Sequence, residues 1–257
     1  MINIEKEHVL DLLRLGRRID GRGLTDFREV FVETDFTATA EGSSRVKIGD
    51  SEVIVGIKFS LETPYPDTPN QGNLMVNAEF LPLSSSRFEA GPPQIDAIEL
   101  ARVVDRGIRE SKMIDTASLC IIPGEKTWGV SIDICTINTD GNLIDASALA
   151  AVIALKNARF PSFDGTSVDY SKKTDKKLEL SKLPICVTVV KAGGKFLVDL
   201  CEEEENAVEA RLNIWTTENG EICALQKGGT SPVTVDDINA MIDLAVEKAG
   251  ELRKFVE

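Results

Sequence analysis

The segment from Ala146 to Leu155 constrains the fold of this 257-residue chain more than any other, because nearly every residue in it is apolar. A helix that is apolar all round is a buried helix. Its uninterrupted apolar run, Ala148 to Leu155, falls far short of the roughly 18 to 20 residues that a membrane span needs. The segment therefore predicts a helix inside the core of a globular protein, and no contact with a membrane.

Elsewhere the apolar residues follow two periods. A period of two predicts half-buried strands over 53–59 and 128–135, and again over 185–189, 196–200, 208–215 and 221–226. Helical spacing predicts amphipathic helices over 5–15, 95–112 and 235–252, the last opening on a capping box at Thr234 to Asp237. Strands followed by a helix, twice in succession, indicate an α+β fold with helices packed on mixed sheets.

The stretch from residue 161 to 182 is poor in large apolar residues and rich in Ser, Lys and Asp. This composition predicts the linker between two domains. We expect a first domain over 1–180, which includes the N-terminal helix and the linker, and a second domain over 181–257.

Charge and cysteine usage exclude several classes of protein. The chain has 42 Asp and Glu against 29 Lys and Arg, a net charge of −13 that argues against indiscriminate nucleic-acid binding. Its five cysteines are dispersed, with no Cys-x-x-Cys pair, as is typical of reduced thiols in a cytoplasmic protein. The single histidine, His8, argues against a Ser-His-Asp triad and a His-ligated zinc site, and we expect no metal and no cofactor. Glu5, Glu7 and Asp11 interrupt any secretory signal near Met1.

One helix carries a row of arginines. At about 100° per residue, Arg102, Arg106 and Arg109 lie within roughly 60° of one another, opposite Leu100, Val104 and Ile108. Neighbouring guanidinium groups repel one another and favour an anionic ligand, for which nucleic-acid phosphates are a good match. The plain alternative is a solvated face on which Glu99, Asp105 and Glu110 neutralise the arginines.

Four ordered motifs resemble the RNase PH family, and within it the non-catalytic subunits of the archaeal exosome. They are Arg18 to Arg22, Gly42 to Asp50, Glu99 to Ser111 and Asp140 to Ala150. The resemblance implies an RNase PH-like fold built from a pair of α+β units. Catalytic members of the family shorten RNA from its 3′ end by attack of inorganic phosphate.

The resemblance also implies that the phosphate-binding turn is lost. Catalytic members hold phosphate with a Gly-(Ser/Thr)-Arg turn where a helix begins, but here Asn142, Leu143 and Ile144 occupy that place and Asp145 follows. Aliphatic side chains donate no hydrogen bond, and a carboxylate repels phosphate. We expect Asn142 or Asp145 to cap a buried helix instead.

A second departure concerns the catalytic acid. Active relatives carry an aspartate where Asp199 stands and a catalytic aspartate at the position that falls on Arg211. A guanidinium in place of a carboxylate removes the general acid there. Glu209 lies two residues away, so an autonomous phosphate-dependent 3′-to-5′ exoribonuclease that uses Asp199 with Glu209 stays open as an alternative.

The resemblance therefore implies an inactive homologue that works only in a complex. Three copies would alternate with three copies of a catalytic RNase-PH-like subunit in a hexameric ring, on which RNA-binding cap proteins dock. Arg102 and Arg106, with Arg109 as a weaker candidate, would hold single-stranded RNA near the partner's active site. A scaffold without RNA contact remains possible on the residues alone. Two minor expectations are that Tyr65 packs within its proline-rich loop rather than stacking on a base, and that Glu202 to Glu205 is solvated surface.

Overall fold

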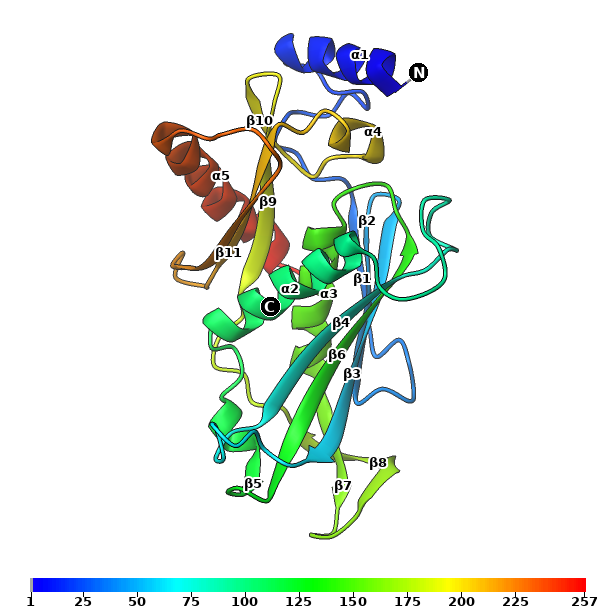
Figure 1. The fold of residues 1–257 in the computed structure, drawn as a ribbon, viewed down its shortest axis with the longest axis vertical. Helices are drawn as coiled ribbons and strands as arrows, with labels where there is room; N and C mark the ends of the chain where they lie inside the picture. Colours follow the sequence, from blue (N-terminus) through cyan, green and yellow to red (C-terminus); the bar gives the residue numbers. More distant parts are fainter. Residues whose placement is uncertain (1) are drawn as a thin grey trace.

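A computed structural model describes residues 2–257, with side chains from residue 6 onward (Figure 1). The larger of its sheets has six strands in the order β1-β2-β3-β6-β4, with β5 paired to β6. These strands are β1 (Val30–Thr34), β2 (Gly42–Ile48), β3 (Ser51–Glu62), β4 (Asn73–Phe80), β5 (Cys120–Ile122) and β6 (Lys126–Asn138). Strand β4 runs parallel to β6, and the other pairs are antiparallel, so the predicted mixed sheet and α+β fold are confirmed.

A second, antiparallel sheet has the order β10-β9-β11-β12. It consists of β9 (Ile185–Ala192), β10 (Lys195–Val198), β11 (Ala210–Thr216) and β12 (Ile222–Gly228), and the short helix α4 (Glu202–Glu205) lies between β10 and β11 in sequence. Helix α5 (Val235–Arg253) packs on β9 and β11. The predicted capping box opens α5: the Asp237 N–H donates to the Thr234 hydroxyl (3.1 Å) and the Thr234 N–H to the Asp237 carboxylate (2.9 Å).

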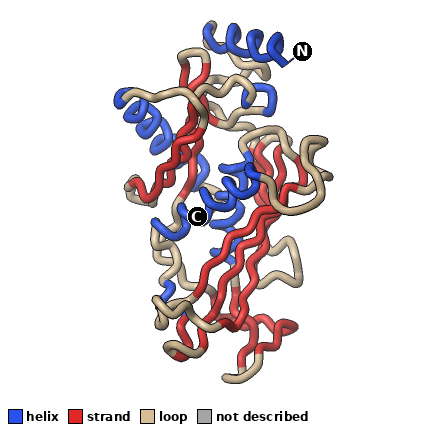
Figure 2. Tube along the Cα trace, viewed as in Figure 1, coloured by secondary structure: helices blue, strands red, loops and turns tan. Residues whose placement is uncertain are grey.

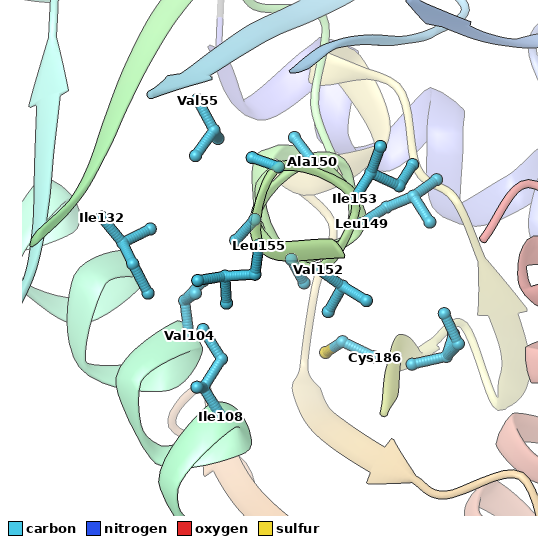
Figure 3. Close-up of a cluster of buried hydrophobic side chains, with 14 of the residues drawn as sticks. Val55, Val104, Ile108, Ile132, Leu149, Ala150, Val152, Ile153, Leu155 and Cys186 are labelled. Carbon is cyan, nitrogen blue, oxygen red and sulfur yellow. The ribbon is translucent and has the colours of Figure 1, made fainter. Parts of the chain in front are cut away.

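The apolar helix α3 (Leu143–Asn157) lies between the two sheets. Figure 3 shows it end-on, with Val55 of β3 and Ile132 of β6 on one side and Cys186 of β9 on another. Strand β2 approaches it so closely that a Cβ on Gly42 would lie 2.4 Å from the Ala154 carbonyl oxygen. Contact with two sheets and a second helix explains why almost every position of α3 is apolar, since each large side chain buried contributes about 1.5–3 kcal/mol.

The second helix of this layer is α2 (Ile95–Glu110), which packs on β4, on α3 and on β12. Figure 2 shows this helical layer in the middle of the molecule, with strands above and below it. The predicted apolar face of Leu100, Val104 and Ile108 is buried. Because Gly107 has no side chain, the Trp215 ring lies directly against the helix, 2.1 Å from where a Cβ would stand.

The segment predicted to be the linker, 161–182, contains regular structure, and its role as a linker between two domains stays a prediction. Strands β7 (Arg159–Phe163) and β8 (Val168–Lys177) form an antiparallel hairpin there. The Phe160 ring stacks on Phe59 at 4.4 Å, and Phe163 meets Trp128 at 5.6 Å. Two aromatic side chains of β7 therefore hold the hairpin on the first sheet, while its polar remainder is stabilised by backbone pairing that composition does not reveal. The domain boundary at residue 180 stays a prediction.

The N-terminal helix is confirmed as α1 (Ile2–Arg14). It packs on the second sheet rather than the first, because Val9 and Leu13 share a small core with Val190, Leu197 and Ala207. The 3₁₀ turn η1 (Thr116–Leu119) precedes β5. Over residues 2–257, no helix combines the length and the apolar character needed to cross a membrane.

Candidate functional site

A pocket of about 290 Å³ lies where α3 begins, between the two sheets. The structure brings together there the positions that the sequence singled out from two distant segments: Asn142, Leu143, Ile144, Asp199 and Arg211. Two aliphatic side chains and an arginine thus occupy the region that the resemblance assigns to phosphate binding and acid catalysis. The wall also includes Phe80, Arg87, Phe88, Asp96, Glu99 and Glu205.

The first turn of α3 is not capped as predicted. Asn142 precedes the helix in a left-handed conformation (φ 54°) and makes no side-chain cap. Its side-chain amide donates instead to Asp199 (2.9 Å), and its backbone N–H donates to the Glu205 carboxylate (2.9 Å). The carboxylate of Glu205 therefore already accepts the Asn142 N–H at the start of the helix, where an external anion would otherwise bind.

Asp145 does not cap α3 either. Its carboxylate accepts hydrogen bonds from the backbone N–H (3.0 Å) and the hydroxyl (2.6 Å) of Thr188 on β9. Complete burial raises the pKa of Asp145 to about 6, although the bonds from Thr188 oppose the rise. Asp145 therefore joins α3 to the second sheet and does not line the pocket, contrary to the expectation that its charge faces the phosphate position.

Asp199 is buried and is held by two arginines, Arg22 and Arg28. Its carboxylate accepts three hydrogen bonds from Arg28, through the backbone N–H, Nε and Nη2 at 2.7–2.9 Å, and one from Arg22 (3.0 Å). Burial alone would raise the pKa of Asp199, but the hydrogen bonds and charge of Arg28 outweigh it and lower the pKa. A carboxylate fixed as an anion in this way is a poor proton donor.

A third arginine, Arg18, shows that the prediction of Glu202 to Glu205 as solvated surface is wrong for one of these residues. Arg18 forms a fully buried ion pair with Glu204 and also donates to the Val198 carbonyl (2.9 Å). Glu204 is therefore not solvated surface, although its neighbour Glu203 is exposed. The family motif Arg18 to Arg22 ties the N-terminal segment to the second sheet, a pairing over more than 170 residues that spacing cannot predict.

Arg211 projects into the pocket and pairs with Glu99 of α2 (2.6 Å). Glu209 does not line the pocket; its carboxylate accepts the N–H of Gly193 (3.1 Å) in the turn between β9 and β10. The structure therefore does not bring Glu209 and Asp199 into one site, which leaves the alternative of an autonomous enzyme without its proposed pair.

The arginine stripe (Arg102, Arg106 and Arg109) lies exposed along α2, as predicted. Arg109 pairs with Asp105 (2.8 Å) and donates to the Leu74 carbonyl of β4. Over the described residues, Arg102 and Arg106 have no carboxylate within 4 Å, and the nearby Glu99 pairs with Arg211 instead. Internal neutralisation therefore accounts for Arg109 and leaves two guanidinium groups free for a ligand.

A groove of about 320 Å³ runs beside the stripe, between α2 and β4, and Arg102, Arg109, Met75 and Ile98 line it. Strand β4 is the last strand of its sheet, so within residues 2–257 one of its edges has no strand partner. Tyr65, in the loop between β3 and β4, is 59 % exposed, and its packing within the loop stays a prediction. Among the residues that the structure describes, no cluster of three or more His, Cys, Asp or Glu could hold a metal ion.

Comparison with known proteins agrees with the motifs. Models of domain 1 and domain 2 of the 3′ exoribonuclease family (RNase PH) match residues 26–161 and 182–248. The exosome complex component Rrp42 of Methanocella arvoryzae is 45 % identical over 99 % of this chain and 96 % of its own length. The structure also superposes on a chain of the Archaeoglobus fulgidus exosome with RNA bound to the active site, with a TM-score of 0.93, 42 % identity and coverage of 100 % of this chain and 99 % of that one. A chain of an archaeal exosome core gives a TM-score of 0.88 at 40 % identity, over 99 % and 97 % of the two chains. This chain belongs to the RNase PH branch of the 3′ exoribonuclease family.

Proposed function

We propose that this chain is a non-catalytic subunit of an archaeal exosome ring. In this proposal it alternates with a catalytic RNase-PH-like subunit, three of each, and RNA-binding cap proteins dock on the ring. It contributes arginines that hold RNA and a surface that structures the partner's active site during 3′-to-5′ phosphorolysis. Its similarity to archaeal exosome chains over nearly its full length supports this assignment.

The observation that carries the proposal is the state of the pocket at the start of α3. Inorganic phosphate needs free N–H groups, a hydroxyl and a cation. Here Leu143 and Ile144 donate nothing from their side chains, and the carboxylate of Glu205 already accepts the N–H of Asn142. A phosphate dianion would have to displace that carboxylate and lie beside its negative charge. The pocket therefore opposes binding of the nucleophile.

The free guanidinium groups of Arg102 and Arg106 support the RNA-binding part of the proposal. Both are exposed and, over the described residues, unpaired, so binding a phosphate requires no ion pair to break. Arg109 would have to leave Asp105 first, which agrees with its weaker role. The net charge of −13 elsewhere limits indiscriminate binding, while two arginines act locally.

The surface around the stripe supports the position of the partner. Four large apolar side chains are exposed there, on α2, β4 and the loop between them: Met75, Leu83, Ile95 and Ile98. Exposed apolar side chains next to arginines are typical of protein interfaces. A catalytic subunit seated on this surface would bring its own active site close to Arg102 and Arg106.

Phosphorolysis by the separate and the mixed proteins tests the inactive-subunit proposal. We expect the purified chain to release no nucleoside diphosphate from polyadenylate with phosphate present, and to raise activity strongly when the catalytic subunit is added. Release of ADP by the pure chain at a rate comparable with the mixed complex would refute the proposal and favour the autonomous enzyme.

RNA binding by the assembled ring tests the role of the arginines. Replacing Arg102 and Arg106 with Ala removes two phosphate contacts, so the slope of log affinity against log salt should fall by roughly 1.4. The matched control replaces Arg14 and Arg17, two exposed arginines at the end of α1, and should leave the slope unchanged. Equal slopes for all three proteins would favour a scaffold without RNA contact.

A further inference from the structure

The hairpin of β7 and β8 concentrates positive charge in an acidic protein. We name residues 159–177 the basic hairpin; it contains five Lys and Arg against three Asp, in a chain whose net charge is −13. Two further lysines reach it from the first sheet, Lys58 of β3 and Lys126 of β6. In Figure 1 the hairpin lies at the lower end of the molecule.

Aromatic rings hold three of these lysines at the hairpin surface. The Nζ atoms of Lys58, Lys126 and Lys176 lie 5.5, 5.7 and 5.1 Å from the ring centres of Tyr170, Phe163 and Phe160, respectively. An ammonium group above a ring is attracted to its face. Lys58 also donates to the Thr39 carbonyl and the Glu41 carboxylate, and Lys126 donates to the Gly165 carbonyl, whereas Lys176 keeps its N–H donors for another ligand. The rings therefore reduce the freedom that these lysines lose when an anion binds.

The carboxylates of the hairpin neutralise only part of its positive charge. Asp164 accepts from Thr166 and Ser167 in its own turn, Asp169 pairs with Lys172 (3.1 Å), and Asp175 lies 3.5 Å from Arg159. Over the described residues, four lysines have no carboxylate within 4 Å: Lys126, Lys173, Lys176 and Lys177. The surface thus has unpaired positive charge and favours an anionic ligand.

The chemistry of the surface fits a single-stranded nucleic acid better than an acidic protein. Protein interfaces are depleted in lysine and centre on buried apolar or arginine anchors. The exposed part of β8 has Ser, Lys and Asp around one aromatic ring, that of Tyr170, which is 48 % exposed. Single strands are bound by dispersed cations together with a ring on which a base stacks.

The position of the hairpin relates it to the arginine stripe. It packs where β3 ends and β6 begins, and the parallel strand β4 begins at the same end of the sheet. Arg109, the last arginine of the stripe, donates to the Leu74 carbonyl near the start of β4. We propose that the basic hairpin is a second binding site for the phosphates of single-stranded RNA, beyond the arginine stripe. The inference rests on the proposed function, because it takes RNA as the ligand.

The test replaces Lys173, Lys176 and Lys177 with Gln, which removes unpaired charge and breaks no ion pair. The matched control makes the same change at Lys195, Lys227 and Lys254, three exposed lysines on the second sheet and after α5. Binding of single-stranded polyadenylate is measured over a range of salt concentrations, for the full chain alone and mixed with the catalytic subunit.

We expect the hairpin variant to lower the salt slope by about 2 if all three lysines contact phosphates, and the control to leave it unchanged. Replacing the same three lysines with Arg should keep the slope, which separates charge from misfolding. An unchanged slope in the Gln variant, with a reduced slope in the Arg102 and Arg106 variant, overturns the hairpin site and leaves the proposed function intact. The reverse result supports the hairpin and refutes the role of the stripe.

Discussion

Replacement of Asp199 with Asn should destabilise the chain more than any surface substitution. Asp199 is 1 % exposed and accepts hydrogen bonds from Arg22, Arg28 and Asn142. Asn in its place puts an amide N–H₂ group against the arginine donors and leaves their charge without its buried partner. Removing one partner of a buried ion pair costs about 3–5 kcal/mol.

Two carboxylates that remain in the Asp199→Asn variant limit the loss of stability. Arg28 keeps Asp140 (2.8 Å) and Arg22 keeps Asp20 (2.6 Å), so neither guanidinium group becomes fully unpaired. We therefore expect a loss at the lower end, about 3 kcal/mol. Since a domain is stable by only about 5–15 kcal/mol, such a loss is a large share of the total.

Urea unfolding followed by tryptophan fluorescence measures the loss, because Trp215 is buried at the contact between α2 and the second sheet. The control is Asp175→Asn, which removes an exposed carboxylate 3.5 Å from Arg159 and should have little effect. A loss below about 1 kcal/mol for Asp199→Asn would refute the idea that this carboxylate joins the N-terminal arginines to the second sheet.

The pH dependence of stability is a second test of the contribution of Asp199. The lowered pKa of Asp199 means that its contribution is present above the unfolded value of about 3.8 and is lost as the pH falls through the lower folded value. The wild-type chain should therefore lose more stability on acidification below pH 4 than the Asp199→Asn variant does.

Three further predictions follow from buried and exposed groups. Because the folded-state pKa of Asp145 is about 6, against 3.8 in the unfolded chain, this group by itself should lower the free energy of unfolding by up to about 3 kcal/mol as the pH rises from 4 to 7, and Asp145→Asn should remove that part of the pH dependence in urea titrations. Gly107→Ala places a Cβ 2.1 Å from the Trp215 ring, so it should lower stability by about 1–3 kcal/mol despite the helix preference for Ala; a rise in the melting temperature would contradict this. Arg102→Ala with Arg106→Ala should change the free energy of unfolding by no more than about 0.5 kcal/mol, since both side chains are exposed and have no carboxylate partner over the described residues; a larger loss in the same assay would assign them a structural role.

Local patterns predicted the elements well because each depends on neighbours in the chain. The alternation around Val55 and Ile132 and the apolar stripe of α5 correspond to confirmed strands and a confirmed helix. The hairpin over 159–177 was not predicted, because most of its side chains are polar and its fold depends on Phe160 and Phe163 packing on strands that are distant in sequence. Composition records the polarity of a segment but not the backbone partner that it finds.

For the candidate site too, some predictions from the sequence agree with the structure and others do not. From the spacing of one helix, the sequence placed three arginines on a common face, and among the residues that the structure describes two of them have no carboxylate partner. It also identified Leu143, Ile144 and Arg211 as departures from the catalytic pattern, and these line one pocket. The capping roles of Asn142 and Asp145 were wrong, because both side chains find partners on the second sheet or next to it.

What the sequence determined by itself is the class of fold, the buried central helix and the loss of donors at the start of that helix, since these follow from side-chain type and local period. Only the tertiary structure decided which charges meet. The pairing of Arg28 with Asp199, of Arg18 with Glu204 and of Arg211 with Glu99 joins residues more than 100 positions apart. Ion pairs of this kind depend on how helices and sheets dock, and docking is set by the shapes of the buried surfaces rather than by any spacing along the chain.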